Sequence, residues 1–384
     1  MRDLAIVSGY FVRCPLGGYA WQVLHYLCGL RAAGFDVFFY EDTAHYAECF
    51  DPRTGVMTGD PGAGVAVAAS FLALHGFADR WIFWDAVRDR HYGLSAADHR
   101  ALFADARLAV SLAAVNRLPR DAGRSRVFID LDPGVTQIQA ETDAELREFL
   151  ASHHAHFTLG GNIGRQGCPL PTAGFVWHPT RAPVALELWE PLPPDTCGAF
   201  TTVGRWDEQR REMVFNGEVY SWRKRQEWLK FLTLPRLSRA RFELAMDVDK
   251  VPGDRALLEE NGWIVTDPFA VSGDPERYRQ FIRSSRAEFT VAKDLNVRLG
   301  SGWFSDRGAC YLAAGRPVIT QDTAFGRTFA AGSGVLPFRT LEDAVHAVRS
   351  VGEDYATRSA AARRLAEESF GAEQIIRELL AVVG

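Results

Sequence analysis

The sequence lacks the long apolar run that a membrane-spanning helix needs. Among its 384 residues, the longest apolar stretch lies roughly between Gly62 and Ala78 and contains His75. It falls short of the roughly 20 residues that are required. Residues 1–3 lead directly into Leu4 to Val7, which is too short for the apolar core of a signal peptide. We therefore expect a cytoplasmic protein without a membrane span.

Positive charge is not in excess, and cysteine is sparse and irregularly spaced. Lys and Arg number 43 against 48 for Asp and Glu, which gives a net charge of -5. No domain-wide basic surface is available to attract a phosphate backbone, so we expect no nucleic-acid partner. The cysteines stand at positions 14, 28, 49, 168, 197 and 310. They form no CxxC pair, which fits buried reduced thiols better than disulfides or a zinc site.

Several common catalytic signatures are absent as well. The sequence has no GxxxxGK[ST], GxSxG or HExxH motif, which disfavours kinases, hydrolases and dehydrogenases. Two DxD sequences, at residues 130–132 and 247–249, have a form that can hold a divalent ion against a diphosphate. Aspartates at strand ends are also ordinary turn residues. We expect neither a metal nor another cofactor.

The sequence does contain a regular alternation of short apolar runs and helical segments. In the first half, strands are predicted at residues 4–8, 37–40, 81–84, 108–112, 127–129, 156–159 and 175–177. In the second half, they are predicted at residues 200–203, 242–246, 263–265, 289–292, 318–320 and 334–336. Helices are predicted between the strands, for example at residues 96–105. Strands separated by helices predict parallel sheets. Because one core rarely holds a chain of this length, we predict an α/β fold of two doubly wound Rossmann-like domains facing a central cleft.

Prolines mark the boundary between these two halves. They break any regular element at positions 179, 183, 191, 193 and 194. We expect residues 1–180 to form an amino-terminal domain, 181–198 a linker, and 199–384 a second domain. The last helix, 372–382, is placed so that it can pack back on the first domain.

The densest group of polar residues lies in a strand, helix, strand unit at residues 288–325. An apolar strand leads at Lys293 into a loop that carries two glycines and several polar residues. Ser305 stands where a helix N-cap is expected, and the next strand ends at Asp322 and Thr323. Polar residues therefore gather at the carboxyl ends of two parallel strands, where open sheets bind ligands.

This unit offers the chemistry of a diphosphate site. Backbone N–H groups between Gly300 and Ser305, the helix dipole, and the charges of Lys293, Arg298 and Arg307 would bind the anion. Hydroxyls of a sugar would bond to the two polar residues at the next strand end. The alternative is that these charges form only the solvated rim of an ordinary strand-helix unit.

Three stretches resemble the GT-B glycosyltransferases, and the resemblance covers almost the whole chain. The Gly17-Gly18 turn before a long helix is similar to the entry of the group 1 (GT4-like) enzymes. Residues 200–206, FTTVGRW, resemble the entry strand of their second domain. Residues 301–323, SGWFSDRGACYLAAGRPVITQDT, resemble the donor signature of the nucleotide-sugar transferases. The run is most similar to its form in a poorly characterised bacterial group. Residues that the resemblance assigns to the nucleotide sugar are Gly17, Gly18, Gly204, Arg205, Ser301, Gly302, Trp303, Ser305, Asp306, Asp322 and Thr323.

The resemblance implies transfer of a glycosyl group, such as a hexose, from a nucleotide diphosphate sugar to a hydroxyl of a small molecule or glycan. It implies that residues 1–180 form the acceptor side and that residues 199–384 bind the nucleotide sugar. The enzyme is expected to be a monomer or homodimer. The paired glutamates of the group 1 signature would fall on Gly302 and Cys310, so neither inversion nor retention is assigned. A sugar-nucleotide epimerase or phosphorylase, or a binding protein without turnover, remains an alternative on the same fold.

An inverting transfer needs a base on the first-domain side of the cleft. Asp85 and Asp132 follow predicted strands of that domain and are the proposed catalytic carboxylates. The alternative is that each aspartate only caps a turn.

Overall fold

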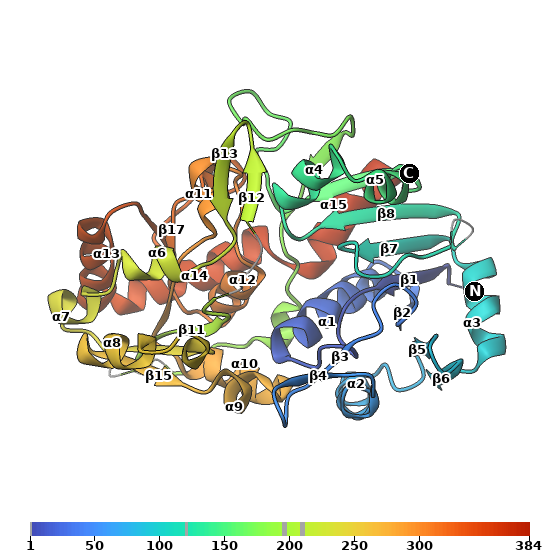
Figure 1. The fold of residues 1–384 in the computed structure, drawn as a ribbon, viewed down its shortest axis with the longest axis horizontal. Coiled ribbons are helices and arrows are strands. Elements are labelled where there is room, and N and C mark those ends of the chain that lie inside the picture. The colour runs from blue at the N-terminus through green and yellow to red at the C-terminus, as the bar shows by residue number, and fades with distance from the viewer. Residues whose placement is uncertain (1, 120–121, 194–197, 208–211) are drawn as a thin grey trace.

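The computed structural model describes residues 2–119, 122–193, 198–207 and 212–384. Within these residues the chain forms two α/β domains, which lie side by side in Figure 1. One is built on an eight-stranded sheet and the other on a six-stranded sheet. No helix in the described part of the chain is both long and apolar enough to cross a membrane.

The first domain has the strand order β10-β9-β8-β7-β1-β2-β5-β6. The strands are β1 (Leu4–Ser8), β2 (Asp36–Asp42), β5 (Trp81–Asp85), β6 (Arg90–Gly93), β7 (Leu108–Leu112), β8 (Ser125–Asp130), β9 (Ala155–Thr158) and β10 (Trp177–Pro179). All neighbours pair in parallel except β5 and β6. The apolar central strands are buried on both faces, as parallel sheets require.

Five helices and a small hairpin complete the described part of this domain. The helices are α1 (Gly17–Ala32), α2 (Gly62–Leu74), α3 (Ala96–Asp105), α4 (Val135–Ala140) and α5 (Ala144–Ala151), and the hairpin is β3 (Cys49–Asp51) with β4 (Val56–Thr58). The prediction of a strand at 175–177 is wrong by two residues. Phe175 is held in a turn by a bond from its N–H to the Thr172 carbonyl, so β10 begins at Trp177.

The second sheet has the order β15-β14-β11-β16-β17-β18 and is parallel throughout. Its strands are β11 (Phe200–Gly204), β14 (Phe242–Met246), β15 (Trp263–Thr266), β16 (Ala287–Thr290), β17 (Val318–Gln321) and β18 (Val335–Phe338). Its helices are α6 (Arg225–Leu229), α7 (Leu234–Ser238), α8 (Asp254–Glu260), α9 (Pro268–Ser272), α10 (Pro275–Ser284), α11 (Asp294–Arg298), α12 (Asp306–Ala313), α13 (Leu341–Glu353), α14 (Tyr355–Ser369) and α15 (Ala372–Val383).

A hairpin of β12 (Glu212–Phe215) and β13 (Glu218–Ser221) stands apart from the main sheet. Asn216 and Gly217 connect its strands with positive φ angles of 51° and 77°. Asn-Gly is a strong sequence signal for such a turn, but the hairpin was not predicted from the sequence. Within the unit at 288–325, the loop expected after Lys293 is instead the short helix α11.

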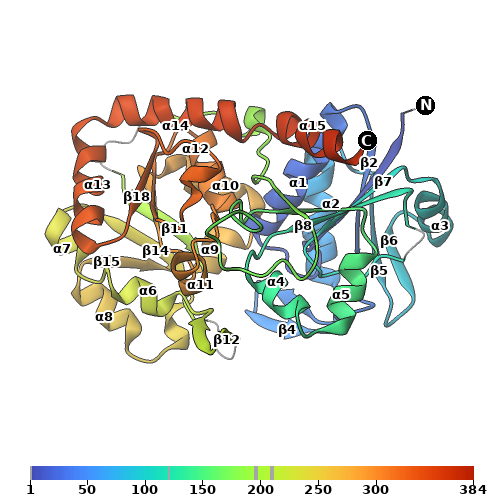
Figure 2. The ribbon, with the colours of Figure 1, turned by 90° about the horizontal axis from the view of Figure 1, so that it is seen from above.

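The chain crosses between the domains twice, and the two crossings are bonded to each other. The N–H of Val184 donates to the Phe370 carbonyl at 2.7 Å, and the N–H of Ala372 donates back to the Val184 carbonyl at 2.9 Å. Figure 2 shows α14 and α15 running from one domain to the other. Of the proposed linker, residues 194–197 lie outside the described residues.

Helix α15 packs against α1 of the first domain. A Cβ atom on Gly29 would lie 2.8 Å from the Ala372 carbonyl oxygen, so only glycine allows this close approach. The described cysteines, at positions 14, 28, 49, 168 and 310, are free thiols, and Cys197 lies outside the described residues.

Candidate active cleft

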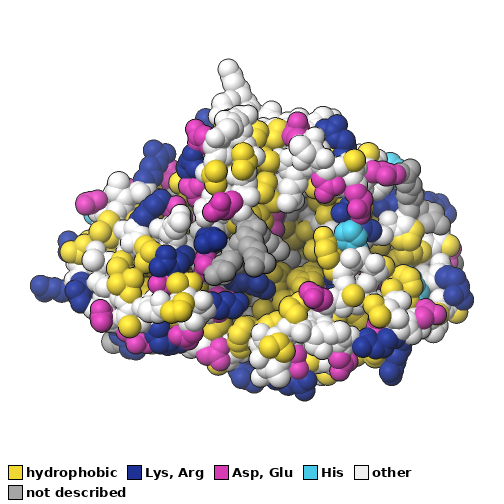
Figure 3. Space-filling model, viewed as in Figure 1, with side chains coloured by type: hydrophobic (Ala, Val, Ile, Leu, Met, Phe, Trp, Pro, Cys, Tyr) yellow, Lys and Arg dark blue, Asp and Glu magenta, His cyan; other side chains and the backbone are white. Residues whose placement is uncertain are grey.

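A cleft of about 430 Å³ lies between the two domains, within the usual range for ligand pockets. From the first domain it is lined by the start of α1 and the β3-β4 hairpin. From the second domain it is lined by residues that follow β11, β14 and β16 and by the start of α12. Figure 3 shows the hollow near the centre of the face, with hydrophobic side chains inside it and Lys or Arg side chains on its left.

The second-domain wall carries a cluster of cationic groups. Its basic members are Arg205, Lys224, Lys250, Lys293 and Arg307. Nζ of Lys293 lies 3.4 Å from the centre of the Trp222 ring and 2.8 Å from Oδ1 of Asp132. Several like charges around one concave wall create a positive potential that favours an anionic ligand.

Arg307 is fixed in place by the sheet beneath it. Its guanidinium donates to the Glu288 carboxylate at 2.6 Å, to the Val203 carbonyl at 2.5 Å and to the Thr290 hydroxyl at 2.9 Å. Burial alone would lower the pKa of Arg307, but the Glu288 charge outweighs burial and the pKa is raised. Arg307 therefore contributes a permanent positive charge, and each of its three nitrogens already donates one hydrogen bond within the protein.

Lys224 is the cation that sequence reasoning missed. Burial, followed by the charges of Arg307 and Lys293, lowers its pKa from 10.5 to about 7. Its ammonium lies 5.4 Å from the centre of the Trp303 ring and has no carboxylate partner among the described residues. Such a group gains most from an incoming anion. The Asn-Gly hairpin that ends just before Lys224 is the sequence signal that could have directed attention to it.

Some of the predicted nucleotide-sugar residues lie at this cleft. Those that line it are Gly18, Gly204, Arg205, Lys293, Asp306 and Arg307. Gly17 begins α1, where its N–H donates to the Ser272 hydroxyl at 3.2 Å. A Cβ on Gly17 would lie 2.3 Å from Cβ of Tyr278, whereas Gly18 has space around it. Gly17 therefore allows a close contact between domains, and Gly18 leaves the wall of the cleft open.

The turn at Gly300 to Trp303 contacts the first domain and does not line the cleft. The expected free N–H groups are already bonded, for example from Gly302 to the Thr323 carbonyl at 2.8 Å and from Trp303 to the Ser301 hydroxyl at 3.2 Å. Asn162 of the first domain donates its N–H to the Ser301 carbonyl at 3.0 Å and its amide to the Gly300 carbonyl at 2.9 Å. These N–H groups therefore do not form an open anion cradle, because bonds within the second domain use them, and Asn162 holds the two carbonyls of the turn against the first domain.

The remaining predicted donor residues point elsewhere. Arg298 pairs with Glu218 and with Asp294 and so anchors the β12-β13 hairpin on α11. Asp322 accepts from the Ala324 N–H and pairs with Arg339, and the buried Thr323 hydroxyl donates to the Trp303 carbonyl at 2.5 Å. Ser305 is buried at the start of α12 and makes no side-chain cap bond. None of these four residues lines the cleft.

The two proposed catalytic aspartates have different surroundings. Asp85 is 1% exposed, accepts the N–H groups of Val87 and Arg88 at 3.2 Å each, and pairs with the Arg88 guanidinium. It is thus bound within a turn and does not line the cleft. Asp132 is half exposed and reaches across the domain boundary to Lys293. Asp132 does not line the cleft either, but its carboxylate contacts Lys293, which does.

Neither DxD sequence presents an open metal site. Asp130 is buried and accepts from Thr136, Gln137 and Thr158 at 2.7 to 2.8 Å. Asp247 accepts from the Trp206 N–H at 2.8 Å and pairs with Lys250. Over the described ranges, no group of three or more His, Cys, Asp or Glu residues is arranged to hold a metal ion.

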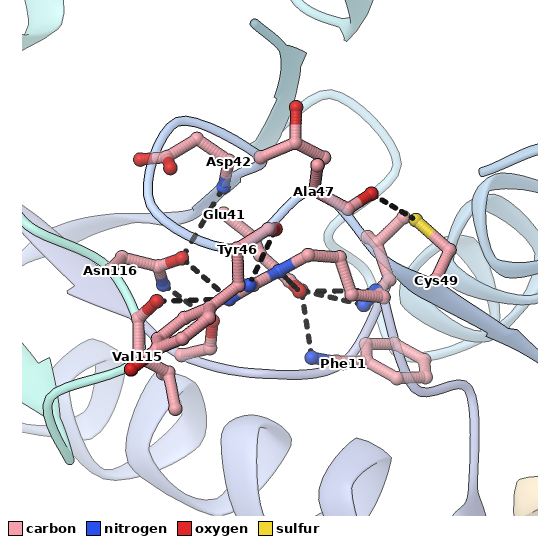
Figure 4. A network of polar contacts seen from close by, with 12 residues as sticks. Phe11, Glu41, Asp42, Tyr46, Ala47, Cys49, Val115 and Asn116 are labelled. Carbon is pink, nitrogen blue, oxygen red and sulfur yellow. Dashed lines mark hydrogen bonds and ion pairs between the residues drawn. The ribbon is translucent and has the colours of Figure 1, made fainter. Parts of the chain in front are cut away.

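The loop between β1 and α1 is pinned by a buried carboxylate. Glu41 accepts the N–H groups of Phe11, Val12 and Arg13 at 2.6 to 3.0 Å and the Arg13 guanidinium at 2.9 Å, as Figure 4 shows in part. Arg13 also donates to Asn116 at 2.9 Å. Burial raises the pKa of Glu41, and Arg13 and the N–H groups oppose that rise. This network fixes the approach to α1 and hence the first-domain wall.

Comparisons with known proteins agree with this architecture. Residues 223–381 match the family model described as Glycosyl transferase-like. The chain is similar to an alpha-glucosyltransferase in complex with UDP and a 13-mer DNA containing a HMU base, with a TM-score of 0.59, 10% identity and 100% of both chains covered. Sucrose-phosphate synthase from Thermosynechococcus elongatus gives a TM-score of 0.55 at 14% identity, again over 100% of both chains.

A glycosyltransferase from Rickettsia africae gives a TM-score of 0.55 at 9% identity, over 100% of this chain and 98% of the other. No curated protein matches the sequence. At such identities the likeness concerns the fold. The predicted fold class is confirmed: the chain has the GT-B architecture of these glycosyltransferases.

Proposed function

We propose that the protein is a glycosyltransferase that moves a sugar from a nucleotide diphosphate sugar to a hydroxyl group of a small molecule or glycan. The observation that carries the proposal is the cationic wall of the cleft. Arg205, Lys224 and Lys293 face one concave space there, and Lys224 holds its charge at a cost that an anion would offset. The GT-B fold and the family match over the second domain support the same conclusion.

In this proposal the cationic wall stabilises the leaving group. Negative charge grows on the diphosphate as the bond to the sugar breaks, and fixed cations nearby lower the barrier. Arg307 holds the wall in shape through Glu288 and the β11 carbonyl. Gly204 leaves the backbone accessible, since a Cβ there would meet nothing closer than 3.6 Å. The cations supply the charge that a metal would otherwise provide, so we propose a metal-independent reaction.

Asp132 is the proposed base on the acceptor side. Its carboxylate bonds to Lys293 at 2.8 Å. A diphosphate that binds Lys293 would compete for this ammonium and release the carboxylate toward an acceptor hydroxyl. Membership of a group 1-like bacterial set is part of the proposal and rests on the residues at the Gly-Gly turn, at 200–206 and at 301–323.

The test is a titration with UDP followed by transfer assays with a panel of nucleotide sugars. We expect UDP to bind and one donor to be turned over with release of the nucleoside diphosphate. An epimerase would change the sugar without releasing the diphosphate, and a phosphorylase would require inorganic phosphate. Absence of UDP, GDP and ADP binding would overturn the proposal.

A further inference from the structure

The two walls of the cleft differ in chemistry. The first domain contributes Leu16, Gly18, Tyr19, Phe50, Gly55 and Met57. None of these described lining residues carries a charge. The charged side chains that line the cleft all come from the second domain in the described part of the chain. A ligand that spans the cleft therefore meets a cationic wall on one side and an apolar wall on the other.

The apolar wall is open to solvent in the cleft. Met57 is 49% exposed, and Leu16, Tyr19 and Phe50 are partly exposed. The Phe50 ring lies 5.2 Å from the Phe269 ring across the domain boundary, and the Tyr19 ring lies edge-on to Tyr10 at 5.1 Å. An apolar ligand would remove these surfaces from water, which favours its binding.

We propose that this wall, formed by Leu16, Tyr19, Phe50 and Met57, binds the acceptor, and that the acceptor is a small molecule with an aromatic or similarly apolar body beside its reacting hydroxyl. The inference rests on the proposed transferase function, which requires an acceptor next to the donor. The proposal restricts the acceptor from any compound with a hydroxyl group to small hydroxyl compounds with an apolar body.

Other acceptor classes fit the wall poorly. The ring hydroxyls of a glycan need hydrogen-bond partners when they leave water, and among the described side chains of this wall only Tyr19 has a polar group. A nucleic acid would need Lys or Arg for its phosphates, and the described first-domain wall has neither. The basic residues opposite are those assigned to the diphosphate of the donor.

The experiment measures binding of three probes to the full chain by calorimetry, with and without UDP. The probes are 2-naphthol, maltotriose and a short DNA duplex. We expect 2-naphthol to bind and the other two to bind at least tenfold more weakly. Met57→Ser and Tyr19→Ser should each weaken 2-naphthol binding about fivefold to tenfold, while the matched controls Met57→Leu and Tyr19→Phe stay within about twofold. All four variants should keep the UDP affinity of the wild type, which shows that they are folded.

The outcomes distinguish failure of the apolar acceptor site from failure of the proposed transferase function. Preferred binding of maltotriose or of the duplex, or 2-naphthol binding that neither serine variant changes, would overturn the apolar acceptor site. Lower UDP affinity in the serine variants, with 2-naphthol unaffected, would assign this wall to the nucleotide and overturn it also. Binding of 2-naphthol that responds to the variants in a chain that binds no nucleotide would support the apolar site and would count against the transferase function alone.

Discussion

We expect Lys224 to lower the free energy of unfolding of the protein, although it favours binding of the ligand. Its pKa falls from 10.5 to about 7 in the folded state. At about 1.4 kcal/mol for each tenfold change in the proton equilibrium, the charged form costs at most about 5 kcal/mol. Because solvent still reaches this half-buried side chain, we expect about 1 to 3 kcal/mol to be measurable. Lys224→Met keeps the length of the side chain and removes this cost.

The sign of the pH dependence follows from the two pKa values. Below about pH 7 the ammonium is charged in both the folded and the unfolded states, so the full destabilisation by the buried charge is present. Between about 7 and 10.5 only the unfolded state holds the proton, so the unfolding free energy of the wild type rises with pH. The stability advantage of Lys224→Met should therefore be largest below pH 7 and should fade toward pH 10.5.

The assay combines urea unfolding with calorimetric titration of UDP. Lys224→Met should be more stable than the wild type at about pH 6 and should bind UDP at least tenfold more weakly, because a charge-assisted hydrogen bond contributes roughly 1.5 to 3 kcal/mol. The matched control is Lys250→Met in the same cleft. Lys250 is more exposed and already pairs with Asp247, so its loss should change stability little. A Lys224→Met protein with wild-type stability at low pH and wild-type UDP affinity would refute the reasoning.

Four further predictions concern the cleft and its surroundings. Lys293→Ala should weaken UDP binding at least tenfold, whereas Arg298→Ala should change it less than about twofold, because Lys293 lines the cleft and Arg298 does not; equal losses in calorimetry would contradict this. Transfer activity should persist in excess chelator, and a strict requirement for Mg²⁺ or Mn²⁺ would direct attention to the DxD sequences. Asp132→Asn should lower turnover by about 10²-fold or more with UDP affinity retained. Asp85→Asn should keep its turnover and lose thermal stability, since its carboxylate is buried with Arg88.

Much of the fold could be predicted because it depends on local patterns. The strands at 4–8, 108–112 and 242–246 and the helix at 96–105 have the same bounds in the structure. The helix has a complete capping box between Ser95 and Asp98, and the strands are buried apolar runs with clear limits. The antiparallel β6 was missed because its residues, Arg90 to Gly93, are polar and lie at the edge of the sheet.

The site was harder to predict because long-range contacts decide which polar groups are free. The N–H groups of the Gly300 to Trp303 turn looked available in the sequence. In the fold the N–H of Gly302 is bonded to the Thr323 carbonyl, and Asn162, 138 residues from Gly300 in the chain, holds the carbonyls of the turn against the first domain. In the same way, Lys224 becomes a member of the cationic wall only when the hairpin brings it beside Arg307 and Lys293. Residue type and spacing identified Lys293 and Arg307 but not their bonding partners.

The paired crossing at Val184 and Gly371 has a mechanical consequence. A single connecting strand would let two bodies swivel about it in any direction. Two segments that are hydrogen-bonded side by side bend about one axis more easily than they twist. Any opening of the domains should therefore follow one arc, and the two halves should return to the same alignment. A protease nick in residues 181–193 would cut the covalent link between the halves, which would then be held together by the packing of α15 on α1.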